Sequence, residues 1–122
     1  MSEIIKANEL RVGNVFACYD SIIKVESINK DYVEGLPNDG HYLISDLEPI
    51  PLTEEWLLKF GATHFAGRVY HLDMYKIAIF DDGAVLILGS MLSNKISIGK
   101  YVHQLQNLYF ALTNEELYGL PW

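Results

Sequence analysis

Hydrophobic and polar residues alternate along the first third of the chain, in short runs that turn-forming residues separate. Four such runs, rich in β-branched and aromatic residues, occupy residues 15–19, 22–29, 32–36 and 41–47. Pro37-Asn38-Asp39-Gly40 is a strong turn signal, because proline fixes φ and glycine accepts the backbone that ends a turn. Short strands at about ten-residue spacing predict an antiparallel β-meander over residues 1–48.

A meander of this kind tends to curl into a small barrel. The spacing of Leu10, Gly13 and Phe16 at the first strand is similar to the opening of small SH3-like barrels. We therefore expect a partly closed, SH3-like barrel in the N-terminal part of the chain.

Two later segments have helical patterns. In the first, Thr53 is suited to cap a helix N-terminus and Gly61 to end the helix. Glu54 and Glu55 would lie in the first turn, where the helix dipole favours negative charge. The apolar stripe of the second helix consists of Tyr101, Leu105, Leu108, Tyr109 and Leu112. After it, Thr113-Asn114-Glu115-Glu116 has the form of a capping box and predicts one further helical turn.

Between the two helices a second set of strands is expected. The runs lie at Val69–Asp73, Tyr75–Phe80, Ala84–Leu88 and Lys95–Ile98. Asp81-Asp82-Gly83 is suited to a hairpin turn. The fold class is therefore predicted as α+β: an SH3-like meander or partial barrel, then a second antiparallel sheet with two short helices on one side. We expect a single domain over residues 1–122, with parts at 1–48 and 49–122.

Charge and cysteine content limit the partners and the cellular compartment that can be expected. Sixteen acidic residues against nine basic ones give a net charge of −7, which disfavours duplex nucleic acid and an anionic membrane surface as partners. Cys18 is the only cysteine and lies in an apolar run, which predicts a small buried side chain and no intrachain disulfide. With this single cysteine, a reducing, cytoplasmic setting is expected. The N-terminus lacks a signal-peptide pattern, and no apolar run is long enough to span a membrane.

The candidate binding residues lie on the C-terminal helix and in the tail after it. His103, Gln106 and Asn107 share one helix face by their i, i+3 and i+4 spacing. They are either a polar recognition strip, a hydrogen-bonded contact with the first barrel, or simply the solvent face, which is the interpretation favoured by the usual polarity of outer helix faces. Trp122, in an apolar tail, is a further candidate for contact with the core or with a partner.

Catalytic and metal sites find little support in the sequence. His71 and Asp73 would share a strand face and, with another histidine, could bind zinc. The chain has no His-x-x-x-His motif and no cysteine pair to anchor such a site. Asp81 and Asp82 are better explained by the hairpin turn. We therefore expect no catalytic residue, no metal and no cofactor.

Three segments resemble a known family. The segments Thr53–Gly61 (TEEWLLKFG) and His103–Thr113 (HQLQNLYFALT) resemble the two hallmark segments of a family of small uncharacterised proteins of gut Bacteroidetes, their mobile elements and their phages. The opening Ala7–Asn14 is similar to the usual N-terminus of that family. Asn114 stands where such proteins often have glycine before the Glu-Glu pair. The resemblance implies no activity, cofactor or catalytic residue.

Three functions remain open. The leading hypothesis is a non-catalytic binding or adaptor protein of a phage or mobile element that acts through protein contacts, including self-association. Abundant tyrosine and the lack of a catalytic signature favour it. A second is a single-stranded nucleic-acid-binding module in which exposed Phe16, Tyr19 or Tyr32 would stack on bases. A third is a small-ligand binder or enzyme, with a pocket between the second sheet and the C-terminal helix near His103 and His71.

Overall fold

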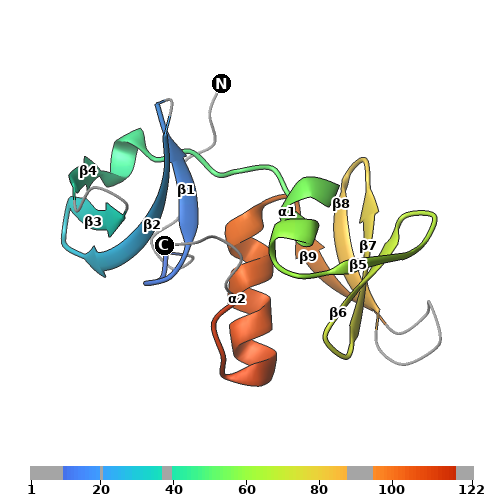
Figure 1. Ribbon diagram of the computed structural model, residues 1–122. Coiled ribbons are helices and arrows are strands. Elements are labelled where there is room, and N and C mark those ends of the chain that lie inside the picture. The colour runs from blue at the N-terminus through green and yellow to red at the C-terminus, as the bar shows by residue number, and fades with distance from the viewer. Residues whose placement is uncertain (1–9, 20, 37–39, 88–94, 118–122) are drawn as a thin grey trace.

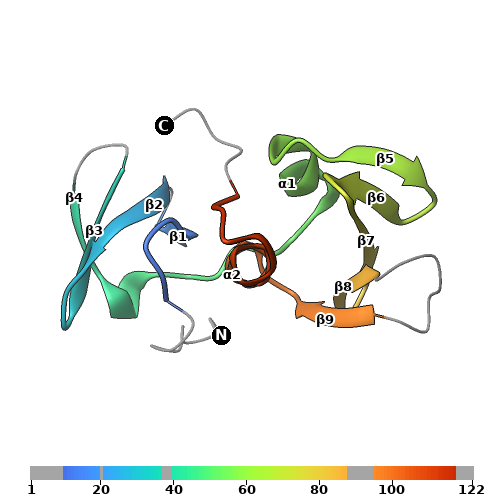
Figure 2. The ribbon, with the colours of Figure 1, turned by 90° about the horizontal axis from the view of Figure 1, so that it is seen from below.

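Helix α2 (Val102–Thr113) lies between two antiparallel sheets, as Figures 1 and 2 show in two views of the computed structural model. The structure describes residues 10–19, 21–36, 40–87 and 95–117. The fold is therefore mixed α+β with antiparallel sheets, as the sequence predicts. In the part of the chain that is described, no helix has the length and apolar character needed to cross a membrane.

The first sheet is a meander in which each strand pairs with the next one along the chain. Its strands are β1 (Val15–Cys18), β2 (Ser21–Ile28), β3 (Tyr32–Leu36) and β4 (Gly40–Leu43). The last predicted strand, residues 41–47, is shorter than expected, because the chain turns into a 3₁₀ helix at Ile44–Asp46. Glu48 then returns to β1 and exchanges two backbone hydrogen bonds with Ala17, of 2.9 and 2.8 Å. The first strand is therefore paired on both sides.

The second sheet contains five strands in sequence order. They are β5 (Thr63–Ala66), β6 (Val69–Leu72), β7 (Tyr75–Phe80), β8 (Gly83–Ile87) and β9 (Lys95–Gly99). Strand β5 was not predicted. All four of its residues are exposed and its pairing with β6 is irregular, so it lacks the apolar alternation that marks a half-buried strand.

Helices α1 (Glu54–Lys59) and α2 pack on the same face of the second sheet. Trp56 and Leu57 from α1 and Leu105 from α2 share one hydrophobic core with strand residues such as Ile77 and Leu86. Thr53 occupies the N-cap position of α1, but its side chain makes no capping hydrogen bond. The short helix is therefore stabilised by packing rather than by its cap.

The end of α2 differs from the prediction. The expected helical turn at Thr113–Glu116 does not form, because Asn114 adopts the left-handed conformation with φ 59° and ends the helix. Thr113 Oγ1 donates to the Tyr109 carbonyl at 2.8 Å and accepts from the Glu115 amide at 3.1 Å. Asparagine is among the few residues that tolerate this conformation, so it serves here as glycine does at many helix ends.

The connector between the first sheet and α1 is hydrogen-bonded to the segment that leads into α2. The Leu52 amide donates to the Lys100 carbonyl, and the Val102 amide donates to the Ile50 carbonyl, both at 2.8 Å. Because Glu48 in the same connector pairs with β1, this short segment links the first sheet to the N-terminus of α2.

A second, smaller core lies within the first sheet. It contains Phe16, Cys18, Ile23, Val25, Val33 and Leu47. Phe16 is fully buried, so the expectation that it is exposed for base stacking is wrong. Its neighbour Val15 belongs to the larger core instead, because successive strand residues point to opposite faces. Strand β1 therefore separates the two cores and contributes to both.

Candidate functional site

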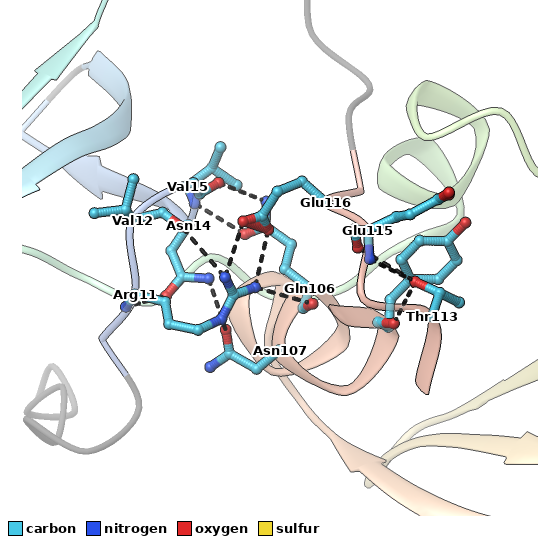
Figure 3. Close-up of polar contacts among 11 residues, drawn as sticks. Arg11, Val12, Asn14, Val15, Gln106, Asn107, Thr113, Glu115 and Glu116 are labelled. Atoms are coloured by element: carbon cyan, nitrogen blue, oxygen red, sulfur yellow. Dashed lines mark hydrogen bonds and ion pairs between the residues drawn. The ribbon is translucent and has the colours of Figure 1, made fainter. Parts of the chain in front are cut away.

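The polar face of α2 packs against the first sheet and is not a solvent face. Figure 3 shows the contact, a polar clasp made of Arg11, Asn14, Gln106, Asn107 and Glu116. These residues come from the segment before β1, from the middle of α2 and from the segment after it. The solvent-face interpretation of the helix is wrong, and the alternative of a hydrogen-bonded contact with the first sheet is confirmed.

Gln106 joins α2 directly to the backbone at the start of β1. The Val15 amide donates to Gln106 Oε1, and Gln106 Nε2 donates to the Gly13 carbonyl, both at 2.9 Å. Only 2% of Gln106 is exposed. An amide side chain is suited to this place because it satisfies one backbone donor and one acceptor at the same time.

Arg11 and Glu116 close the clasp at the surface. The two terminal guanidinium nitrogens of Arg11 contact the two carboxylate oxygens of Glu116 at 2.9 and 3.0 Å. Arg11 Nε and Asn14 Nδ2 both donate to Asn107 Oδ1, at 3.0 and 2.8 Å. The guanidinium also lies 4.4 Å from the centre of the Phe110 ring. A bidentate pair combined with a cation–π contact fixes the arginine in one orientation.

The other two predicted site residues are His103 and Trp122. His103 is 2% exposed, and its ring centre lies 5.0 Å from that of Phe16, so it is part of the contact between α2 and the first sheet. Trp122 lies outside the described residues. No sequence pattern marks Arg11, Asn14 or Glu116 as partners of the helix. A local pattern could not do so, because Arg11 and Glu116 are 105 positions apart in the chain.

His71 and Asp73 do not form the pair that their spacing suggested. Strand β6 ends at Leu72, and Asp73 stands in the following turn with φ 53°. Its carboxylate accepts a short hydrogen bond from the Tyr109 hydroxyl on α2. That hydrogen bond, followed by burial, raises the pKa of Tyr109 to about 12. The contact ties the β6–β7 turn to the helix.

We predict a pH-dependent loss of stability from this phenol. In the unfolded chain a tyrosine ionises at about pH 10, whereas folded Tyr109 keeps its proton until about pH 12. The stabilisation is therefore complete below about pH 10 and is lost, by about 3 kcal/mol, as the pH rises through about 12. Phenolate absorbance should show a late ionisation that is smaller in Tyr109→Phe and retained in Tyr32→Phe. The pKa values of Tyr19 and Tyr70 are raised as well, Tyr19 by the nearby Asp46 and Tyr70 by burial, so the readout is the amplitude of the late ionisation. An amplitude that is the same in Tyr109→Phe and in the unaltered protein would refute the assignment.

The described residues assemble no metal site, and the cysteine is buried. No group of three or more histidine, cysteine, aspartate or glutamate side chains in the described ranges could hold a metal ion. Cys18 is 3% exposed, which confirms the prediction that it is buried. Burial, with smaller effects of Asp46 and Glu48, raises the pKa of its thiol and keeps it protonated.

The face of the second sheet opposite the two helices carries a different set of side chains. His71, Lys76, Ile87 and Lys95 are successive cross-strand partners on this outer face. Phe65 of β5 is 58% exposed, stacks on His71 at 4.6 Å between ring centres, and lies 5.2 Å from the Lys76 ammonium. No acidic residue stands in this row, although the chain as a whole is acidic.

A pocket of about 270 Å³ opens at the other end of the same strands. It is bounded by Pro51 and Leu52 of the connector, by the β7–β8 hairpin, by the end of β9 and by Tyr101. Neither His103 nor His71 is among its lining residues, so it is not the pocket that the third hypothesis expected.

Comparison with known proteins gives no relative for this chain. No protein-family description, no curated protein and no solved structure matches it.

Proposed function

We propose that the protein is a non-catalytic binding protein that acts through protein contacts, and that the outer face of the second sheet is its contact surface. The observation that carries the proposal is Phe65, a large aromatic side chain that is 58% exposed yet held in place by His71 and Lys76. Aromatic side chains of this kind are enriched in the centres of protein interfaces. Because the ring is already oriented, binding would cost little conformational entropy.

The charge on this face indicates the chemistry of the partner. Lys76 and Lys95 lie on either side of Ile87 across neighbouring strands, in a chain with a net charge of −7. Ile87 is only 6% exposed, so Phe65 is the apolar side chain that this face presents. A partner surface that presents carboxylates around an apolar patch would complement this face. The side chains of the polar clasp bind one another and the backbone of the same molecule. This supports a contact surface in another part of the protein.

Two expectations from the sequence complete the proposal: an SH3-like N-terminal part and an origin in a phage or mobile element. The meander, the 3₁₀ helix and the return of Glu48 to β1 support an SH3-like partial barrel in the N-terminal part. We propose that the protein is a cytoplasmic adaptor of a phage or mobile element, on the basis of the three segments that resemble the Bacteroidetes family.

The test is a comparison of Phe65→Ala with Met74→Ala. Met74 is 85% exposed in the turn between β6 and β7, so it controls for the loss of an exposed apolar side chain. Proteins captured from a bacterial lysate are identified, purified and titrated against each variant, and light scattering measures self-association. We expect Phe65→Ala to weaken the contact about tenfold or more and Met74→Ala to leave it unchanged.

Two outcomes would contradict the proposal. One is a strict monomer that captures nothing. The other is a partner, or a second copy of the chain, that binds Phe65→Ala and the unaltered protein equally well.

The outer face also supports a second candidate, the single-stranded nucleic-acid-binding module. Phe65 could stack on a base while Lys76 and Lys95 contact phosphates. The expected result is micromolar binding of a single-stranded oligonucleotide at low salt that weakens in Lys76→Gln and with added salt. No binding at about 100 µM oligonucleotide would exclude this candidate.

A further inference from the structure

We infer that the pocket at the end of the β7–β8 hairpin is a binding site for a small carboxylic acid with a flat, apolar body. The site is separate from the contact surface around Phe65, because Phe80 stands at the opposite end of β7 from Lys76. The inference therefore does not depend on the proposed protein contact.

The walls of the pocket are apolar and include two aromatic rings. Leu52, Phe80, Ala84 and Tyr101 contribute to the lining, and Phe80 is 42% exposed. A volume of about 270 Å³ is below the usual range of about 300–1,000 Å³ for ligand sites. The pocket therefore suits a body of one aromatic ring with a short chain rather than a nucleotide or a large cofactor.

Hydrogen bonds hold these walls in place. Gln104 Oε1 accepts from the amides of Lys100 and Tyr101 at 2.9 and 3.0 Å. The Leu52 amide donates to the Lys100 carbonyl at 2.8 Å, which joins the connector to the end of β9. The pocket is therefore formed before a ligand binds. Binding to a preformed site costs less conformational entropy.

The charges at the rim favour an anionic head group. Asp81 and Lys100 are the charged lining residues. Asp81 lies 3.4 Å from Arg68, which partly neutralises it, while the described residues provide no ion pair for Lys100. An incoming carboxylate therefore has an available cation in Lys100, and its apolar body can cover Phe80 and Tyr101.

The experiment titrates the full chain with 3-phenylpropionate and follows amide chemical shifts by NMR. Matched probes are the neutral 3-phenylpropanamide and the cationic 3-phenylpropylamine. We expect the carboxylate to bind with a Kd on the order of 1 mM and to shift the amides of residues 80–84 and 99–101. Lys100→Gln should weaken carboxylate binding about two- to fivefold and leave amide binding unchanged.

Two further variants separate the site from general effects. Phe80→Ala removes one wall and should weaken all probes, with the folded spectrum confirming that the protein remains intact. Lys30→Gln removes an exposed lysine from the β2–β3 turn and should change nothing. The inference is overturned if the amine binds best, if Lys100→Gln does not discriminate between the probes, or if no probe binds at about 10 mM.

Discussion

Replacing Gln106 with leucine is expected to lower the free energy of unfolding by about 2–4 kcal/mol, because two backbone groups lose their partners. The Val15 amide and the Gly13 carbonyl both bond to this side chain at 2.9 Å, in a place where Gln106 is 2% exposed. Leucine has a similar size but neither donates nor accepts. The measurement is urea denaturation of the purified variant, with the midpoint and slope fitted together.

The control for this variant is Ala111→Gln, on the exposed side of the same helix. It should change the free energy of unfolding by no more than about 0.5 kcal/mol. Hydrogen exchange adds a local readout, because loss of the clasp should increase exchange in β1 more than in β7. If Gln106→Leu costs less than about 1 kcal/mol, the clasp does not join the sheet to the helix in the way described.

Replacing Gly99 with alanine is expected to cost about 2–4 kcal/mol, from backbone strain together with a lost cap. Gly99 has φ 108°, and an added Cβ would come too close to Gln104 Oε1. That oxygen accepts from the amides of Lys100 and Tyr101 at the start of α2. The methyl group would therefore displace the side chain that satisfies both donors. Thermal and urea unfolding measure the loss.

Gly61 provides a matched control for the strain. It has φ 93°, and an added Cβ there would meet nothing within 4 Å. Gly61→Ala should therefore show the cost of the left-handed backbone alone, about 1–2 kcal/mol. The difference between the two variants measures the contact with Gln104. Equal losses at the two positions would show that this contact contributes nothing.

The candidate site could be predicted only in part. The spacing of His103, Gln106 and Asn107 correctly places them on one face of a helix, and a contact with the first sheet was one of three interpretations. Only the position of β1 beside the helix distinguishes the three interpretations, because Val15 and Gln106 are 91 positions apart in the chain. The outer face around Phe65 could not be predicted from the sequence, because β5 has no alternation of apolar and polar residues. That Phe65 stacks on His71 is known only from the pairing of β5 with β6.

Local patterns in the sequence determined most of the strands, both helices, the burial of Cys18 and the antiparallel α+β class. They could do so because alternation, helical spacing and turn residues act within a few positions of the chain. Only the tertiary structure decided what α2 does between its two sheets. From its predicted apolar stripe, Leu105 and Tyr109 share the core of the second sheet, whereas Leu112 is 40% exposed. Gln106 and Asn107 hydrogen-bond to the segment around the start of β1. A polar helix face looks the same in sequence whether water or a distant backbone satisfies it, so the difference appears only when the chain is folded.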